Sequence, residues 1–115
     1  MRTLALDVGT RRTGIAFLDD AVGVPVALDT FRHDRFDALV RHVERLVRER
    51  SIHRVVVGLP LLLSGREGRQ ARIVRSVAAM LEKPGLDIVL EDERYTTPAE
   101  NGIDRDAAAA VALLN

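Results

Sequence analysis

The sequence contains no cysteine and no tryptophan, and only one tyrosine and three phenylalanines among its 115 residues. The absence of cysteine excludes disulfides, zinc–thiolate sites and thiol nucleophiles, and it fits a reducing compartment. So few aromatic rings offer little for base stacking. If the protein binds nucleic acid, we therefore expect recognition through phosphates and shape.

A long apolar run is also missing. No stretch approaches the roughly 18 residues that a membrane-spanning helix needs. The apolar opening MRTLALDVGT carries a charge at Asp7, which is not typical of a signal peptide. We therefore expect a cytoplasmic protein without membrane association, and the length suits a single domain over residues 1–115.

Net charge is the third absence, because 17 basic residues balance 17 acidic ones. Zero net charge argues against a protein that coats nucleic acid by bulk electrostatics. The distribution is uneven: residues 32–75 hold 11 arginines against 5 acidic residues, and residues 76–115 hold 3 basic against 8 acidic residues. Lys83 is the only lysine. Arginine is the better bidentate phosphate ligand, but biased genome composition explains the larger part of this preference.

Three strands are predicted in the first quarter of the chain, at residues 3–8, 14–18 and 22–28. The first two are apolar and end at polar turns, and short connections of this kind favour an antiparallel meander. Pro25 cannot donate a ladder hydrogen bond, so the third strand is expected at an edge or to be irregular.

From residue 36 the hydrophobic period becomes helical, and helices and strands then alternate. Residues 36–47 predict a helix with Asp34 or a neighbour as its N-cap. A continuously apolar strand at 54–60, a helix at 73–81, a strand at 87–90 and an Ala-rich helix at 106–114 follow. The order βββαβαβα predicts an α/β fold with a mixed five-stranded sheet, made of the meander and two parallel strands, with helices on its faces.

Asp7 is the first candidate for chemistry. A carboxylate in an otherwise apolar central strand is costly unless it is paired, hydrogen-bonded or bound to metal. Capping of the following Gly9-Thr10 turn is an equally plausible structural role. The sequence alone does not favour the functional interpretation over the structural one.

Two further acidic clusters follow. In Glu91-Asp92-Glu93, strand alternation places Asp92 on one face and the two glutamates on the other. Asp104 and Asp106 stand at the start of the last helix, where aspartate is also a common N-cap. The topology allows a central strand, a later strand and a C-terminal helix to bring carboxylates together above one sheet. Hard oxygen ligands of this kind suit Mg²⁺ or Mn²⁺, and two such ions can support phosphodiester cleavage.

The ordered motifs of this chain resemble those of the YqgF/RuvX family, whose members are described as Holliday junction resolvases or pre-16S ribosomal RNA nucleases with an RNase H-like fold. The resemblance covers nearly the whole sequence. It rests on Asp7-Val8-Gly9-Thr10-Arg11-Arg12-Thr13-Gly14, Val57-Gly58-Leu59-Pro60, Gly65, Gly68-Arg69-Gln70-Ala71 and Asp92-Glu93-Arg94-Tyr95-Thr96-Thr97.

The resemblance implies a metal-dependent endonuclease for four-way junction DNA or precursor rRNA. Asp7 matches the family's first metal-binding aspartate, Glu93 the second acid and Asp106 the helical aspartate, with Asp104 as the reserve for the last role. Alternation does not decide between Asp92 and Glu93. Two Mg²⁺ or Mn²⁺ ions are expected, and a two-fold junction would favour a homodimer, although the sequence shows no decisive interface.

Five arginines are candidates for contacts with nucleic-acid phosphates. Gly68 opens the second helix, whose first N–H groups could hold a phosphate together with nearby arginines. Turning of an ordinary loop and turn-tip charges are the structural alternatives. The candidates are Arg11, Arg12, Arg66, Arg69 and Arg94.

The chain departs from the family pattern between Thr97 and Asp106. Family members usually have a longer helical and basic stretch there, whereas this chain has only residues 98–105, with Arg105 as the one base. A catalytically weak module that binds nucleic acid or the ribosome is therefore the alternative function. An actin-like sugar kinase is less favoured, because such enzymes clamp a nucleotide between two domains and this sequence predicts one.

Overall fold

The structure is a computed structural model that describes residues 1–92 and 105–114. β1 (Arg2–Val8) and β2 (Arg12–Asp19) form an antiparallel hairpin. β5 (Arg54–Leu59) lies parallel to β1, and β6 (Asp87–Asp92) lies parallel to β5. The long strands therefore follow the order β2-β1-β5-β6 across the sheet, with the mixed pairing that the sequence predicts.

The predicted third strand at residues 22–28 is wrong in its extent. Two strands of two residues each, β3 (Val26–Ala27) and β4 (Phe31–Arg32), pair antiparallel with β2 instead. Pro25 precedes β3 and has no N–H for a ladder, which explains why pairing begins only after it. Among residues 1–92 and 105–114 the sheet thus has six strands rather than the predicted five. β4 pairs with β2 but is not part of the order β3-β2-β1-β5-β6.

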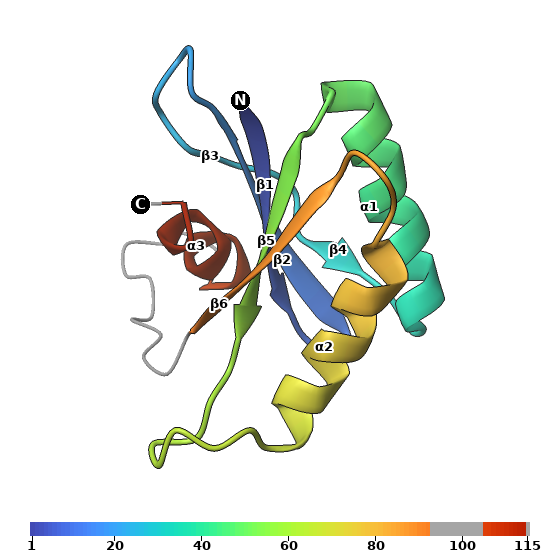
Figure 1. Cartoon of the computed structure of the whole chain (residues 1–115), viewed down its shortest axis with the longest axis vertical. Coiled ribbons are helices and arrows are strands. Elements are labelled where there is room, and N and C mark those ends of the chain that lie inside the picture. The colour runs from blue at the N-terminus through green and yellow to red at the C-terminus, as the bar shows by residue number, and fades with distance from the viewer. Residues whose placement is uncertain (93–104, 115) are drawn as a thin grey trace.

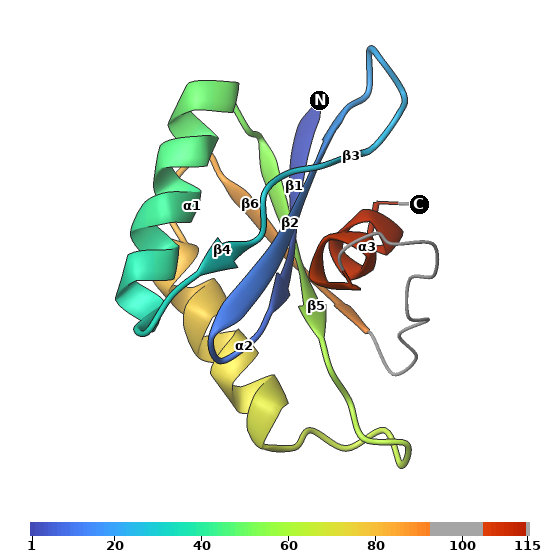
Figure 2. The same cartoon turned by 180° about the vertical axis from the view of Figure 1, so that it is seen from behind.

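Helices cover both faces of this sheet. α1 (Phe36–Arg50) and α2 (Arg69–Leu81) lie on one face, and α3 (Arg105–Ala112) lies on the other, as both views show (Figures 1 and 2). None of the helices in the described part of the chain is long and apolar enough to cross a bilayer.

The N-cap of α1 is Arg35, the neighbour of Asp34, rather than Asp34 itself. The Arg35 side chain makes no capping hydrogen bond. Asp37 stands inside the first turn, where its charge suits the helix dipole, and it pairs with Arg35 at 3.0 Å and Arg41 at 3.3 Å. The helix begins two residues after Asp34, too late for that side chain to cap it.

The two faces of the sheet bury different kinds of side chain. Large aliphatic residues from β1, β2 and β5 pack against α1 and α2. On the other face, Ala5 and Ala16 pack against Ala110 of α3. Small side chains allow a helix to approach a sheet closely, so α3 lies directly over β1 and β2. This face is also the one toward which Asp7 is directed.

Candidate active site

Asp7 occupies the penultimate position of β1 and is half-buried. Leu6 and Val8 belong to the large aliphatic core, so alternation places Asp7 on the opposite face with Ala5. Its partner in the β1–β2 register is Gly14, which adds no side chain beside the carboxylate. The sequence of β1 therefore directs Asp7 toward the α3 side of the sheet, near the carboxyl ends of the parallel strands.

The register across β5 and β6 identifies which acidic residues share that face. Gly58 follows the last paired position of β5 with β1, which places it alongside Asp7. Gly58 pairs with Glu91, and Leu59 pairs with Asp92. Glu91 is thus in lateral register with Asp7 through Gly58 and is directed toward the same face. The two residues are about 10 Å apart, which is two strand spacings. Asp92 falls on the next row, whose residues are directed toward the face that α1 and α2 cover.

The remaining predicted acids have no described side chains. Glu93, Asp104 and the predicted phosphate ligand Arg94 lie outside the described residues. Position 106 lies in the first turn of α3, one helical turn before Ala110. Within the described residues, no group of three or more His, Cys, Asp or Glu side chains is arranged to hold a metal ion.

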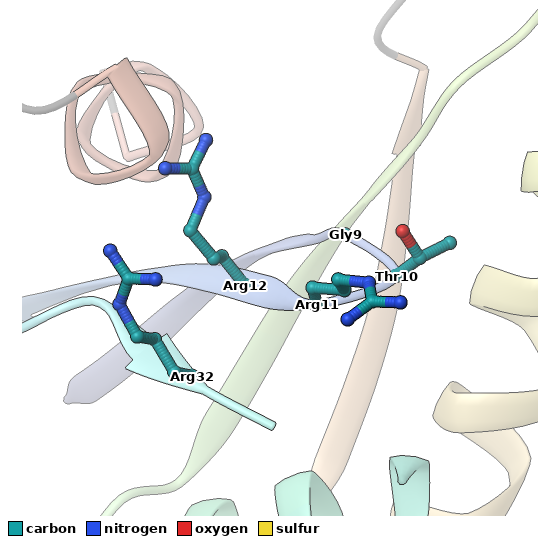
Figure 3. Close-up of a pocket in the computed structure, with 5 residues that line it drawn as sticks. All are labelled: Gly9, Thr10, Arg11, Arg12 and Arg32. Atoms are coloured by element: carbon teal, nitrogen blue, oxygen red, sulfur yellow. The ribbon is translucent and has the colours of Figure 1, made fainter. Parts of the chain in front are cut away.

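The β1–β2 turn requires glycine at its first position. A Cβ on Gly9 would collide with the backbone carbonyl oxygen of Arg12, so no larger residue fits without moving the turn. The turn brings Arg11 and Arg12, both exposed, to the edge of the sheet where Asp7 lies. Predicted as phosphate contacts, they line a pocket of about 460 Å³ together with Gly9, Thr10 and Arg32 (Figure 3).

Arg32 is a residue that sequence reasoning missed. β4 pairs Arg32 directly with Arg12 of β2. A strand of two residues has no periodicity to reveal its partner, so only the folded register shows this pairing. In Figure 3 the Arg12 and Arg32 side chains project side by side from neighbouring strands toward the side on which α3 lies.

Buried polar contacts hold β4 against β2. The His33 backbone N–H donates to the Arg11 carbonyl oxygen at 2.9 Å, and His33 Nε2 lies 2.8 Å from Thr13 Oγ1. His33 is 6% exposed, and its Nδ1 has no partner among the described residues. Burial lowers the pKa of His33, and the nearby charge of Asp34 opposes this effect. The neutral imidazole is therefore the form that fits this site.

The other two histidines also have structural contacts. His42 stacks on Phe31 with ring centroids 4.0 Å apart, and burial lowers its pKa, with a smaller contribution from Arg45. His53 Nδ1 accepts a hydrogen bond from the Arg2 backbone N–H at 3.1 Å.

The loop before α2 reaches the same end of the sheet. Gly68 is the N-cap of α2, and Arg66 and Arg69, predicted as phosphate ligands, are both exposed beside it. The Gln70 side-chain amide donates to the Val8 carbonyl oxygen at 2.9 Å, which joins the first turn of α2 to the end of β1. The loop is therefore attached to the strand that carries Asp7.

A bidentate ion pair fastens this loop to its own helix. Arg75 Nε and Nη2 donate to the two Glu67 carboxylate oxygens at 2.6 and 2.7 Å. The hydrogen bond from Arg75 lowers the pKa of Glu67. Both groups are at the surface, so this pair orders the loop more than it stabilises the fold.

Comparison with protein-family models identifies the family of this chain. The model of the RuvX family, described as Holliday junction resolvase, matches residues 1–115. The chain belongs to the RuvX family. The resemblance inferred from the motifs around Asp7, Gly58 and Gly68 is thereby confirmed.

Curated bacterial relatives carry the name "Putative pre-16S rRNA nuclease". The relative from Novosphingobium aromaticivorans is 38% identical over 96 residues, which cover 84% of this chain and 62% of that protein. The relative from Chloroflexus aurantiacus is 39% identical over 97 residues, which cover 84% and 63%. The chain therefore spans less than two thirds of the length of these two relatives.

Two solved structures share the fold. Thermus thermophilus RuvC, in complex with a Holliday junction substrate, superposes with a TM-score of 0.71 over 98% of this chain and 89% of that one, at 13% identity. The fowlpox virus resolvase, in complex with Holliday junction DNA, gives a TM-score of 0.53 over 86% and 65%, at 12% identity. The fold of this RuvX-family chain is thus RNase H-like, as the motifs predict.

Proposed function

We propose that this chain is a metal-dependent endonuclease that hydrolyses phosphodiester bonds in structured nucleic acid. Family membership supports a nuclease, and the names of relatives point to two substrate classes, four-way junction DNA and precursor 16S rRNA. The observation that carries the proposal is the placement of Asp7. This half-buried carboxylate lies at the carboxyl edge of the sheet, beside a turn that bears Arg11 and Arg12.

The acids proposed to hold metal are Asp7, Glu93 and Asp106, with Asp104 as the reserve. Asp7 offers hard oxygen donors on the face that carries α3, which fits Mg²⁺ or Mn²⁺. Glu91 shares the face of Asp7 in the register, which supports a ligand from the end of β6, whereas Asp92 falls on the other face. Two bound ions would activate water and stabilise the leaving oxygen.

The arginines have a separate part in the proposal. Arg11, Arg12, Arg66 and Arg69 lie around the edge that holds Asp7, and we propose that they bind substrate phosphates and orient the strand over that carboxylate. Arg94 is proposed for the same role from the family motif. A homodimer acting in the cytoplasm on a two-fold junction remains part of this proposal.

A binding module without catalysis is the second candidate function. Zero net charge and the short segment at residues 98–105 favour it. Such a module would bind nucleic acid with a steep salt dependence and cut nothing under any metal.

The deciding experiment is cleavage of a labelled four-way DNA junction and of a precursor 16S rRNA fragment. Reactions contain Mg²⁺, Mn²⁺ or EDTA, with the wild type beside Asp7→Asn. We expect metal-dependent cutting by the wild type and a loss of at least about a hundredfold in the variant, because a neutral amide is a poor ligand for a hard cation. Binding without cutting in every metal would reject the nuclease and support the binding module.

A further inference from the structure

Arg12 and Arg32 form a cross-strand pair of like charge. They are directly opposite each other in the β2–β4 register, where two cations normally destabilise a sheet. β4 has only two residues, so its own ladder cannot offset much repulsion. The contacts of the adjacent His33 with Arg11 and Thr13 keep β4 in place nevertheless. The fold thus holds two guanidinium groups on neighbouring strands.

The pair faces the side of the sheet that carries Asp7. Thr13 and Phe31, the next cross-strand pair, are directed toward the large aliphatic core, so alternation places both arginines on the α3 side. Figure 3 shows the two side chains projecting side by side in that direction. The pocket that they line contains no acidic residue among its described lining residues.

We propose that Arg12 and Arg32 form a clamp for one backbone phosphodiester of the nucleic-acid strand. Neighbouring strands are about 4.8 Å apart, so two guanidinium groups can each reach one of the two non-bridging oxygens of a single phosphate. The inference deepens the proposed function by adding Arg32, which has no assigned role in the family motifs above.

The position of the clamp relative to Asp7 fits a single strand that contacts both. Asp7 pairs with Gly14, and Arg12 is two residues from Gly14 on the same face. Such diagonal neighbours are about 7–8 Å apart along a sheet. The clamp would therefore hold a phosphate close to the one that is cut.

The test measures binding in EDTA, so that cleavage plays no part. Fluorescence anisotropy follows the labelled four-way DNA junction and the precursor rRNA fragment from 50 to 300 mM salt. The proteins are the wild type, Arg12→Ala, Arg32→Ala, Arg32→Lys and the double alanine variant. Arg48→Ala is the matched control, because it removes an exposed arginine from α1 on the opposite face.

We expect Arg32→Ala to weaken binding at least about tenfold, as the loss of a charge-assisted hydrogen bond to phosphate implies. The slope of log affinity against log salt should fall by about 0.9 for duplex arms. Arg32→Lys should restore the slope but not the full affinity, because lysine lacks the planar fork. In the Arg12→Ala background the effect of Arg32→Ala should shrink below about twofold, because both side chains hold one phosphate.

The same measurements define what would overturn the clamp. It fails if Arg32→Ala, with an unchanged melting temperature, matches Arg48→Ala in affinity and salt slope, or if the wild type binds neither polymer. The melting temperature of every variant is measured beside that of the wild type, so misfolding is distinguished from loss of a phosphate contact. Free inorganic phosphate is the other candidate ligand. If submillimolar phosphate raised the melting temperature of the wild type but not of Arg32→Ala, and the wild type bound neither polymer, the pair would be a site for free phosphate instead.

The cleavage assay separates this inference from the proposed function. Loss of binding in Arg32→Ala, combined with no cleavage by the wild type in any metal, would support the clamp and reject the nuclease. If cleavage depended on Asp7 while Arg32→Ala changed neither binding nor the cleavage rate, the result would support the nuclease and reject the clamp.

Discussion

The acidic residues at the end of β6 differ in the face they occupy, and single substitutions should reveal it. Asp92 is paired with Leu59, whose row belongs to the large aliphatic core. We expect Asp92→Asn to change metal-dependent cleavage by less than about twofold, and Glu93→Gln to reduce it by at least about a hundredfold, as for loss of a metal-bound carboxylate. The measurement is the single-turnover rate in Mn²⁺ for both variants, with circular dichroism to check folding.

The opposite ranking would contradict the proposed ligand set. If Asp92→Asn abolished cutting while Glu93→Gln did not, the acid at this strand end would be Asp92. Asp92 would then have to act from the face that α1 and α2 cover, contrary to the alternation along β6.

His33 makes the stability of the β4 region depend on pH. Because burial lowers its pKa, the folded protein takes up a proton less readily than the unfolded chain, whose histidine titrates near 6.5. The unfolded state therefore binds more protons as the pH falls below about 6.5. The contribution to stability is fully present above that pH and is lost as the pH falls through the folded pKa.

Urea denaturation between pH 7.5 and 5 measures this effect. We expect the free energy of unfolding to fall on acidification, with His33 contributing at most about 1.4 kcal/mol per pH unit. His33→Gln should give a shallower pH dependence, and the remaining slope should include His42, whose pKa burial also lowers. A slope unchanged by this substitution would show that the His33 environment does not disfavour the charged ring.

At the scale of elements, Gln70 joins α2 to the end of β1. Its side chain donates to the Val8 carbonyl oxygen, one residue after Asp7. We expect Gln70→Ala to lower the free energy of unfolding by about 1–2 kcal/mol, because a part-buried carbonyl loses its donor. Cleavage should fall more than binding, because the displaced turn changes the position of Asp7 and leaves the arginines in place.

Denaturation, anisotropy and cleavage on the same preparation test this prediction. Ser76→Ala is the control, because it also removes a hydrogen bond of α2, from Ser76 Oγ to the Arg72 carbonyl oxygen, away from β1. Equal losses of binding and cleavage in Gln70→Ala would mean that the bond stabilises the fold without positioning the site.

The sequence predicts a helix or strand reliably only where the periodic pattern of buried residues extends over several repeats. β1, β5, α1 and α2 carry several periods of buried residues, so their existence and type could be read directly. β3 and β4 have two residues each, and their pairing with β2 is determined by tertiary contacts such as the one between Thr13 and His33. That is why the predicted strand at residues 22–28 was wrong.

The same reasoning separates the site residues. Asp7 is recognisable because its charge interrupts an apolar strand. The glutamates on either side of Asp92 are recognisable because three consecutive acidic residues follow another apolar strand. Arg32 has no such signal: it is one of 11 arginines between residues 32 and 75, and only the register with Arg12 distinguishes it. Cross-strand neighbours of a short edge strand are a property of the folded chain.

At the scale of the whole molecule, opposite charges share one face of the sheet. Asp7 and Glu91 lie on the side to which Arg12 and Arg32 project, while the sequence as a whole has no net charge. A phosphate backbone that approaches this face is attracted by the arginines and repelled by the carboxylates. Bulk electrostatics cannot offset that repulsion in a neutral protein, so we expect bound cations to matter for affinity as well as for cleavage.

Calcium tests this expectation without requiring cleavage. It is a hard cation that takes carboxylate oxygens but is larger and less strict in geometry than Mg²⁺. At constant ionic strength, 5 mM Ca²⁺ should tighten binding of the four-way junction by the wild type about tenfold over EDTA, equivalent to about 1.4 kcal/mol. In Asp7→Asn the EDTA affinity should rise, because one repelling charge is gone, and the gain from Ca²⁺ should shrink to about twofold or less. If Ca²⁺ increased the affinity of both proteins equally, the cation would bind elsewhere on the complex. The Asp7 carboxylate would then not be responsible for the effect of Ca²⁺ on affinity.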